Sequence, residues 1–63
     1  MSKKLVVRVH GKNATFEIFQ VRSILSSDSY QLYRNDKYQG TYSSRADAVR
    51  KAHEKAGPGA YES

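Results

Sequence analysis

The chain has 63 residues, no cysteine and a formal net charge of +5 at pH 7. This length allows one small domain, and the lack of cysteine excludes disulfide bonds and thiolate zinc sites. No stretch has the length and apolar character of a membrane span or a signal peptide, so we expect a cytoplasmic protein that does not bind membranes.

Two strands are predicted at the start of the chain. Residues 4–10 alternate between apolar and polar side chains and are rich in valine, a pattern typical of a half-buried strand. Residues 14–22 predict a second strand after a glycine-containing turn. Its apolar phase shifts between Ile18 and Phe19. A β-bulge near Phe19 or burial on both faces of the sheet would explain the shift.

The middle of the chain predicts a loop and then a hairpin. Residues 23–29 are rich in serine around the apolar pair Ile24 and Leu25. We expect this pair either to tuck beneath the loop or to be exposed for a partner. Two further strands are predicted at residues 30–34 and 37–42. An Asn-Asp turn joins them, because both residues tolerate the left-handed conformation that a tight turn needs.

A helix is predicted between Ser44 and Gly57. Ser44 followed by Asp47 is typical of a helix N-terminus, where the serine hydroxyl satisfies a free backbone N–H. Gly57 followed by proline is typical of a helix C-terminus. The apolar stripe at helical spacing is narrow and mostly alanine, which lets the helix approach a sheet closely; it consists of Ala48, Val49, Ala52 and Ala56.

These elements predict an α+β fold in which an antiparallel β-meander of three to four strands packs on one C-terminal α-helix. Residues 1–57 are expected to form a single β-β-β-β-α domain, and residues 58–63 a flexible tail. The strand residues expected to face the helix are Leu5, Val7, Val9, Leu32 and Tyr42.

The sequence predicts no enzymatic activity. It shows no glycine-rich phosphate loop and no paired carboxylates at a useful spacing. Its two histidines, His10 and His53, are far apart in the chain and are interpreted as ordinary surface residues. We therefore expect no catalytic residue, no bound metal and no cofactor.

The basic excess lies mainly in residues 1–27, which hold five basic residues and one acidic residue. A basic surface favours nucleic acid or an acidic protein as partner. By strand parity, a bulge near Phe19 would gather cations, amides and a tyrosine ring on the sheet face away from the helix; a straight strand would instead place Glu17 and Phe19 there. Lys4, Arg8, Lys12, Arg22 and Lys37 are the predicted phosphate contacts, and Gln20, Gln31, Tyr33 and Gln39 are the predicted groove contacts.

Residues 38–48 read Tyr-Gln-Gly-Thr-Tyr-Ser-Ser-Arg-Ala-Asp-Ala. This stretch resembles the strand-to-helix junction of plant ethylene-response-factor DNA-binding domains and of related integrase arm-binding domains. The match consists of Gly-Thr-Tyr at 40–42, the capping Ser44, and Ala48. The resemblance implies a three-stranded sheet that enters the DNA major groove. The chain departs from the plant family because it has no tryptophan and because strand 4–10 has no counterpart there.

The sequence thus favours a small non-catalytic domain that binds nucleic acid, and DNA in particular, through a basic sheet face. The alternative is a protein-protein interaction or inhibitor module of the kind that phages and mobile elements encode. The short length, the five tyrosines and the pair Ile24-Leu25 favour that alternative. A homodimer formed by pairing of an open sheet edge is compatible with either function.

Overall fold

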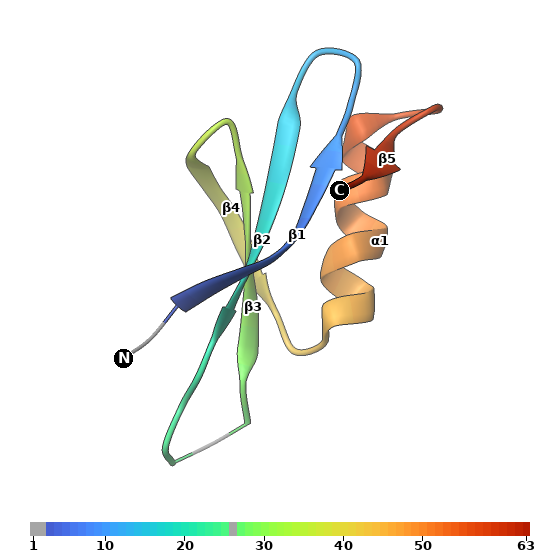
Figure 1. The fold of residues 1–63 in the computed structure, drawn as a ribbon. Coiled ribbons are helices and arrows are strands. Elements are labelled where there is room, and N and C mark those ends of the chain that lie inside the picture. Colours follow the sequence, from blue (N-terminus) through green and yellow to red (C-terminus); the bar gives the residue numbers. More distant parts are fainter. Residues whose placement is uncertain (1–2, 26) are drawn as a thin grey trace.

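The computed structural model describes residues 3–25 and 27–63. Its elements are β1 (Lys3–His10), β2 (Thr15–Val21), β3 (Ser29–Arg34), β4 (Lys37–Tyr42), α1 (Arg45–Ala56) and β5 (Tyr61–Glu62). The strands form one antiparallel sheet in the order β4-β3-β2-β1-β5. Helix α1 covers one face of this sheet (Figure 1). The predicted α+β fold, an antiparallel meander packed on one helix, is confirmed.

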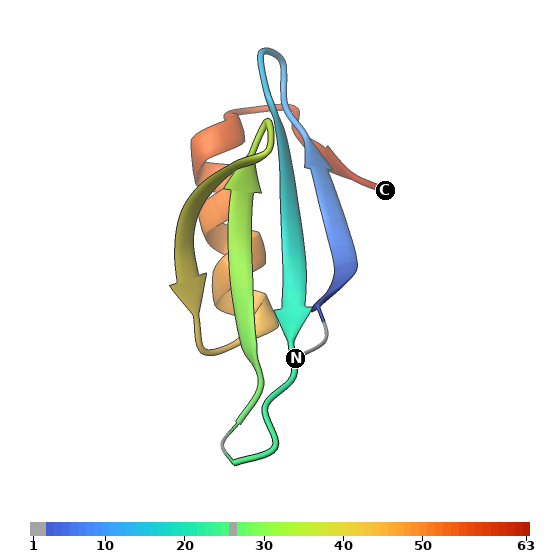
Figure 2. The ribbon, with the colours of Figure 1, turned by 90° about the vertical axis from the view of Figure 1, so that its left-hand side faces the viewer.

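The two faces of the sheet have different surroundings. We call the face that packs on α1 the helix face and the opposite one the open face. Figure 2 shows the open face toward the viewer, with α1 behind the sheet. Among the described residues, no helix lies on the open face. None of the helices in this part of the chain has the length and apolar character needed to cross a lipid bilayer.

The core lies between the helix face and α1. Large apolar side chains come from the strands, and α1 contributes alanines that let it approach the sheet closely. The buried core residues are Val7, Val9, Phe16, Ile18, Leu32, Ala48 and Ala52. Burial of apolar surface contributes roughly 25 cal/mol per Å², so this cluster supplies most of the drive for folding.

The irregularity in the first hairpin lies in β1 and not in β2. Leu5 pairs with Phe19 and Val7 pairs with Ile18, so Val6 is the extra residue. Strand β2 therefore runs straight, and a bulge near Phe19 was the wrong explanation of its apolar pattern. Because side chains alternate along a strand, Phe19 and its partner Leu5 both lie on the open face. Leu5 is exposed and does not belong to the core, contrary to the prediction.

The second hairpin has the predicted turn. Asn35 and Asp36 have φ values of 48° and 71°, the left-handed conformation of a tight hairpin turn. The pairing of β3 with β4 contains a register shift that leaves Gln39 as an extra residue next to Gly40. A glycine inside a strand often marks such a bulge. The bulge interrupts the regular edge that β4 presents to solvent.

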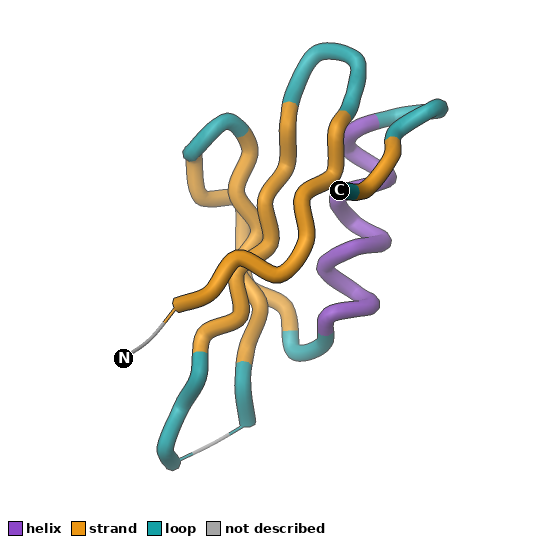
Figure 3. The backbone as a smooth tube through the Cα atoms, viewed as in Figure 1, coloured by secondary structure: helices purple, strands orange, loops and turns teal. Residues whose placement is uncertain are grey.

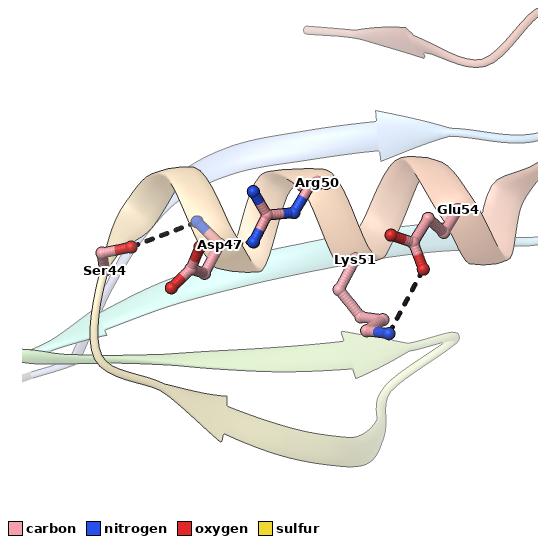
Figure 4. Close-up of polar contacts among 5 residues, drawn as sticks. All are labelled: Ser44, Asp47, Arg50, Lys51 and Glu54. Carbon is pink, nitrogen blue, oxygen red and sulfur yellow. Dashed lines mark hydrogen bonds and ion pairs between the residues drawn. The ribbon is translucent and has the colours of Figure 1, made fainter.

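The helix begins and ends where the sequence predicts. The hydroxyl oxygen of Ser44 accepts a hydrogen bond from the backbone N–H of Asp47 at 3.2 Å (Figure 4). Gly57 has φ 90°, and its N–H donates to a carbonyl of the last helical turn at 3.0 Å. Figure 4 also shows the ion pair between Lys51 and Glu54, whose side chains are 43% and 57% exposed. Such exposed pairs contribute only about 0.2–1 kcal/mol each.

The C-terminal segment forms a fifth strand where the sequence predicts a flexible tail. His10 pairs with Tyr61 in the β1–β5 ladder, and their rings stack with centroids 4.9 Å apart. His53 of α1 lies 3.0 Å from the carboxylate of Glu62. Both histidines therefore contact this short strand, and the local sequence of residues 58–63 carries no alternation that would have predicted it.

Candidate nucleic-acid interface

The open face carries its side chains in rows that cross the sheet from β4 to β1. The register of the three hairpin pairings defines these rows, since directly opposed residues point to the same face. One row consists of Tyr38, Tyr33, Glu17 and Arg8, and the next consists of Thr41, Gln31, Phe19 and Leu5. Val21 and Lys3 continue the face beyond Phe19 and Leu5.

Three rings on neighbouring strands form what we call the aromatic cluster, Phe19, Tyr33 and Tyr38. The rings of Phe19 and Tyr33 meet edge to face at 5.4 Å, and those of Tyr33 and Tyr38 at 5.7 Å. The ammonium of Lys3 lies 4.7 Å from the Phe19 centroid and 4.6 Å from the Tyr33 centroid. It also donates a hydrogen bond to the Tyr33 hydroxyl at 3.3 Å. The cluster thus joins ring faces to a positive charge at the protein surface.

Hydrogen bonds orient two of these rings. The Tyr33 hydroxyl donates to the side-chain oxygen of Gln31 at 3.1 Å. The hydroxyls of Tyr38 and Thr41 lie 2.6 Å apart within β4. Because each tyrosine is tied to a neighbour on the same face, fewer rotamers remain open to its ring. A platform held in this way costs less entropy to use in binding.

The centre of the open face carries an ion pair. Arg8 donates to one carboxylate oxygen of Glu17 through Nε at 3.2 Å and through Nη2 at 3.0 Å. The side chains are 40% and 21% exposed, respectively. Arg8 lies on the face that the sequence predicts, but its charge is offset by Glu17. This carboxylate reaches the face because β2 runs straight.

Three of the predicted site residues, Lys4, Gln20 and Lys37, lie on the wrong face. Lys37 pairs with Arg34, which pairs with the buried Phe16, so both cations belong to the helix face. Lys4 pairs directly with Gln20, and Gln20 shares the parity of the buried Ile18, so both belong to the helix face. The side-chain amide of Gln20 donates to Asp28 at 2.7 Å. The prediction assumed a bulge in β2, which would have turned Gln20 outward, and it did not foresee the bulge at Val6.

Lys37 and the remaining predicted cations lie at the two ends of the sheet. Lys12 in the β1–β2 turn and Lys37 beside the β3–β4 turn are at one end, which we call the hairpin end (Figure 3). Arg34, the partner of Lys37, adds a third cation there. Arg22 follows β2 at the opposite end, the loop end. Within residues 3–25 and 27–63, none of these four lies within ion-pair distance of a carboxylate.

The last predicted contact, Gln39, occupies the bulge at the sheet edge. Its side-chain amide donates to the backbone carbonyl of Lys37 at 3.3 Å. Gln31 and Tyr33 are therefore the predicted groove contacts that the structure brings together on the open face. Phe19 was absent from the predicted set, although its parity in a straight β2 would have identified it.

The loop after β2 exposes two large apolar side chains. Ile24 is 101% exposed and Leu25 is 96% exposed. Of the two arrangements expected for this pair, exposure is therefore the one observed. A small domain gains nothing in stability from such side chains, which makes the loop a second candidate contact surface.

The histidines make contacts at the surface. His10 Nε2 lies 2.6 Å from Ser63 Oγ, and His53 contacts the carboxylate of Glu62; all four side chains are solvent-accessible. Within the described residues, no three histidine, aspartate or glutamate side chains are placed to hold a metal ion. The absence of catalytic activity stays a prediction.

Comparisons of the chain with protein-family models, with curated proteins and with solved structures find no match. The similarity of residues 38–48 to plant and integrase DNA-binding domains therefore remains a resemblance.

Proposed function

We propose that the protein is a non-catalytic nucleic-acid-binding domain that uses the open face of its sheet. The observation that carries this proposal is the aromatic cluster, with the Lys3 ammonium against two of its rings, on a face that no described helix covers. Rings attract bases and cations attract phosphates. The net charge of +5 makes a polyanion a better partner than a neutral surface.

The contacts divide between the face and its two ends. Lys12 and Lys37 at the hairpin end, and Lys3 and Arg22 at the loop end, neutralise phosphates; Lys37 reaches its phosphate from the helix-face side of the sheet. Gln31 and Thr41, which adjoin the rings, hydrogen-bond to base edges. DNA is the nucleic acid expected from the sequence, and the cytoplasm is the expected compartment. If α1 instead faced the ligand, the aromatic cluster would make no contact with it.

A salt titration tests this function. We expect the protein to bind mixed-sequence duplex or single-stranded DNA at low salt. With about four phosphate contacts, affinity falls between about 50 and 200 mM salt by roughly fifty-fold for a single strand and about 150-fold for a duplex, because neutralised phosphates release counterions. Fluorescence anisotropy with a labelled oligonucleotide measures it. No binding of either form at low salt would remove the proposal.

A matched pair of charge variants distinguishes the ends of the sheet from bulk charge. Arg22→Ala with Lys37→Ala removes two cations from the ends of the sheet. Arg45→Ala with Lys55→Ala removes two exposed cations from α1, so both variants have the same net charge. The first is expected to weaken binding about ten- to hundredfold and the second less than threefold. Equal losses would show that the interface is not on the sheet.

The exposed pair Ile24-Leu25 supports protein binding as a second candidate function. Full exposure of two aliphatic side chains on one loop is typical of a contact surface. A partner recovered from the source cell after nuclease treatment, and lost with Leu25→Asp, would support it. Retention of the partner by Leu25→Asp would exclude this loop as the contact. The substitution is expected to leave the fold intact, because Leu25 is 96% exposed.

A further inference from the structure

We infer that the open face binds single-stranded nucleic acid, with unpaired bases stacked on the aromatic cluster. This inference rests on the proposed function and specifies its ligand. The reason is that the open face presents aromatic ring faces at its surface. Ring faces recognise the faces of bases, and those faces are free in a single strand but covered by neighbouring base pairs in a duplex.

The side chains of the open face are poorly suited to a duplex groove. Groove reading needs extended donors and acceptors along the sheet, yet Gln20 and Lys4 lie on the helix face. The centre of the open face holds the carboxylate of Glu17, which is engaged by Arg8. A sheet inserted in a groove would bring this carboxylate between two phosphate strands. A single strand can pass beside it.

Lys3 marks the position where a base would stack. Its ammonium lies 4.7 Å from the Phe19 centroid and 4.6 Å from the Tyr33 centroid. A flexible, exposed lysine leaves such a position at a cost of only about 0.5–1 kcal/mol. When a base takes its place on the rings, the ammonium is within reach of the phosphate of that nucleotide. The same residue thus covers the rings in the free protein and contacts the backbone in the complex.

The cations at the two ends of the sheet suit a strand that runs along the open face. Lys12 in the β1–β2 turn lies at the hairpin end, whereas Lys3 and Arg22 lie at the loop end. Arg34 and Lys37 also lie at the hairpin end but belong to the helix face. The aromatic cluster lies between these groups and spans β2, β3 and β4. A backbone held at both ends places its bases over the rings. This arrangement predicts little sequence preference, because every base has a face that stacks.

The experiment compares an oligothymidylate of about ten nucleotides with a hairpin duplex of mixed sequence, by anisotropy at one low salt concentration. The wild-type protein is expected to bind the single strand at least tenfold more tightly, with quenching of its tyrosine fluorescence. Tyr33→Leu with Tyr38→Leu keeps apolar bulk but removes two ring faces. This variant is expected to bind the single strand about ten- to hundredfold more weakly.

Two control variants make the result specific. Tyr61→Leu changes a tyrosine that is 63% exposed, close to the 57% of Tyr38, but that lies outside the aromatic cluster. It is expected to change affinity less than threefold. Tyr33→Phe keeps the ring and is expected to retain wild-type affinity within threefold. This variant separates the loss of stacking from a loss of folding, which circular dichroism checks for every variant.

The outcomes are distinguishable. Tighter binding of the single strand, lost with the two ring faces, supports the inference. Duplex binding as tight as or tighter than single-strand binding overturns it but leaves the proposed function standing. Single-strand binding unchanged in the folded Tyr33→Leu, Tyr38→Leu variant also overturns it. No binding of either ligand contradicts the proposed function itself.

Discussion

Phe16→Ala is expected to leave the chain unfolded at 25 °C. The Phe16 side chain is 1% exposed and belongs to the core between the sheet and α1. Truncating a buried phenylalanine costs about 3–5 kcal/mol, through lost burial and the cavity left behind. A core of this size provides only about 3–5 kcal/mol of net stability. The expected loss therefore equals the whole stability of the domain.

Phe19→Ala is the matched control, because it removes the same side chain three residues later on the open face. Phe19 packs against Tyr33 and Lys3 on the open face and is not part of the core cluster. We expect a loss of about 1 kcal/mol and a folded protein. Circular dichroism with urea denaturation measures both variants. A folded Phe16→Ala protein, or an equal loss of unfolding free energy in the two variants, would show that Phe16 and Phe19 are assigned to the wrong faces of the sheet.

Neutralising Arg8 or Glu17 one at a time is expected to change the nucleic-acid affinity in opposite directions. Arg8→Gln removes a cation and leaves a carboxylate alone at the centre of the open face. Its affinity is expected to fall about ten- to thirtyfold. Glu17→Gln removes the repulsion and frees Arg8 for a phosphate. Its affinity is expected to rise about three- to tenfold.

Anisotropy at one fixed low salt concentration measures these two variants against the wild type. Neither is expected to change the free energy of unfolding by more than about 1 kcal/mol, because the pair is partly exposed. Glu17→Gln raises the net charge by one unit, and Asp47→Asn on α1 raises it by the same amount. Asp47→Asn is therefore the control for bulk charge. An equal gain from Asp47→Asn and Glu17→Gln would contradict a role for the open face.

The helix and the hairpins were predictable because local chemistry determines them. Ser44 and Gly57 bound α1 through hydrogen bonds that depend only on neighbouring residues. Asn35 and Asp36 specify their turn by tolerating positive φ. In each case, interactions between residues that are close in the sequence determine the structure.

The composition of the open face was only partly predictable, because it depends on the register between strands. An apolar shift in β2 has two explanations, and the sequence of β2 alone does not choose between them. The chain places the extra residue at Val6 in β1, whose regular pattern of valines showed no sign of it. This one residue sends Lys4 to the helix face and Leu5 to the open face. The straight run of β2 places Gln20 on the helix face and Phe19 on the open face.

The C-terminal strand was missed for a similar reason. Residues 61–62 are held by groups distant in sequence, through the stacking of Tyr61 on His10 and the contact of Glu62 with His53. Two residues are too few to show the alternation of a strand. Contacts of this kind appear only when the fold brings β1, α1 and the tail together.

The most direct test of the open face as the interface is a two-dimensional ¹H–¹⁵N NMR titration with single-stranded DNA. The shifts are expected to cluster on β2, β3 and β4 around Phe19, Tyr33 and Tyr38. Amides on the solvent side of α1, around Arg45 and Lys55, should move little. Shifts centred on α1 or on the loop around Ile24 and Leu25, with the aromatic cluster unaffected, would contradict the account.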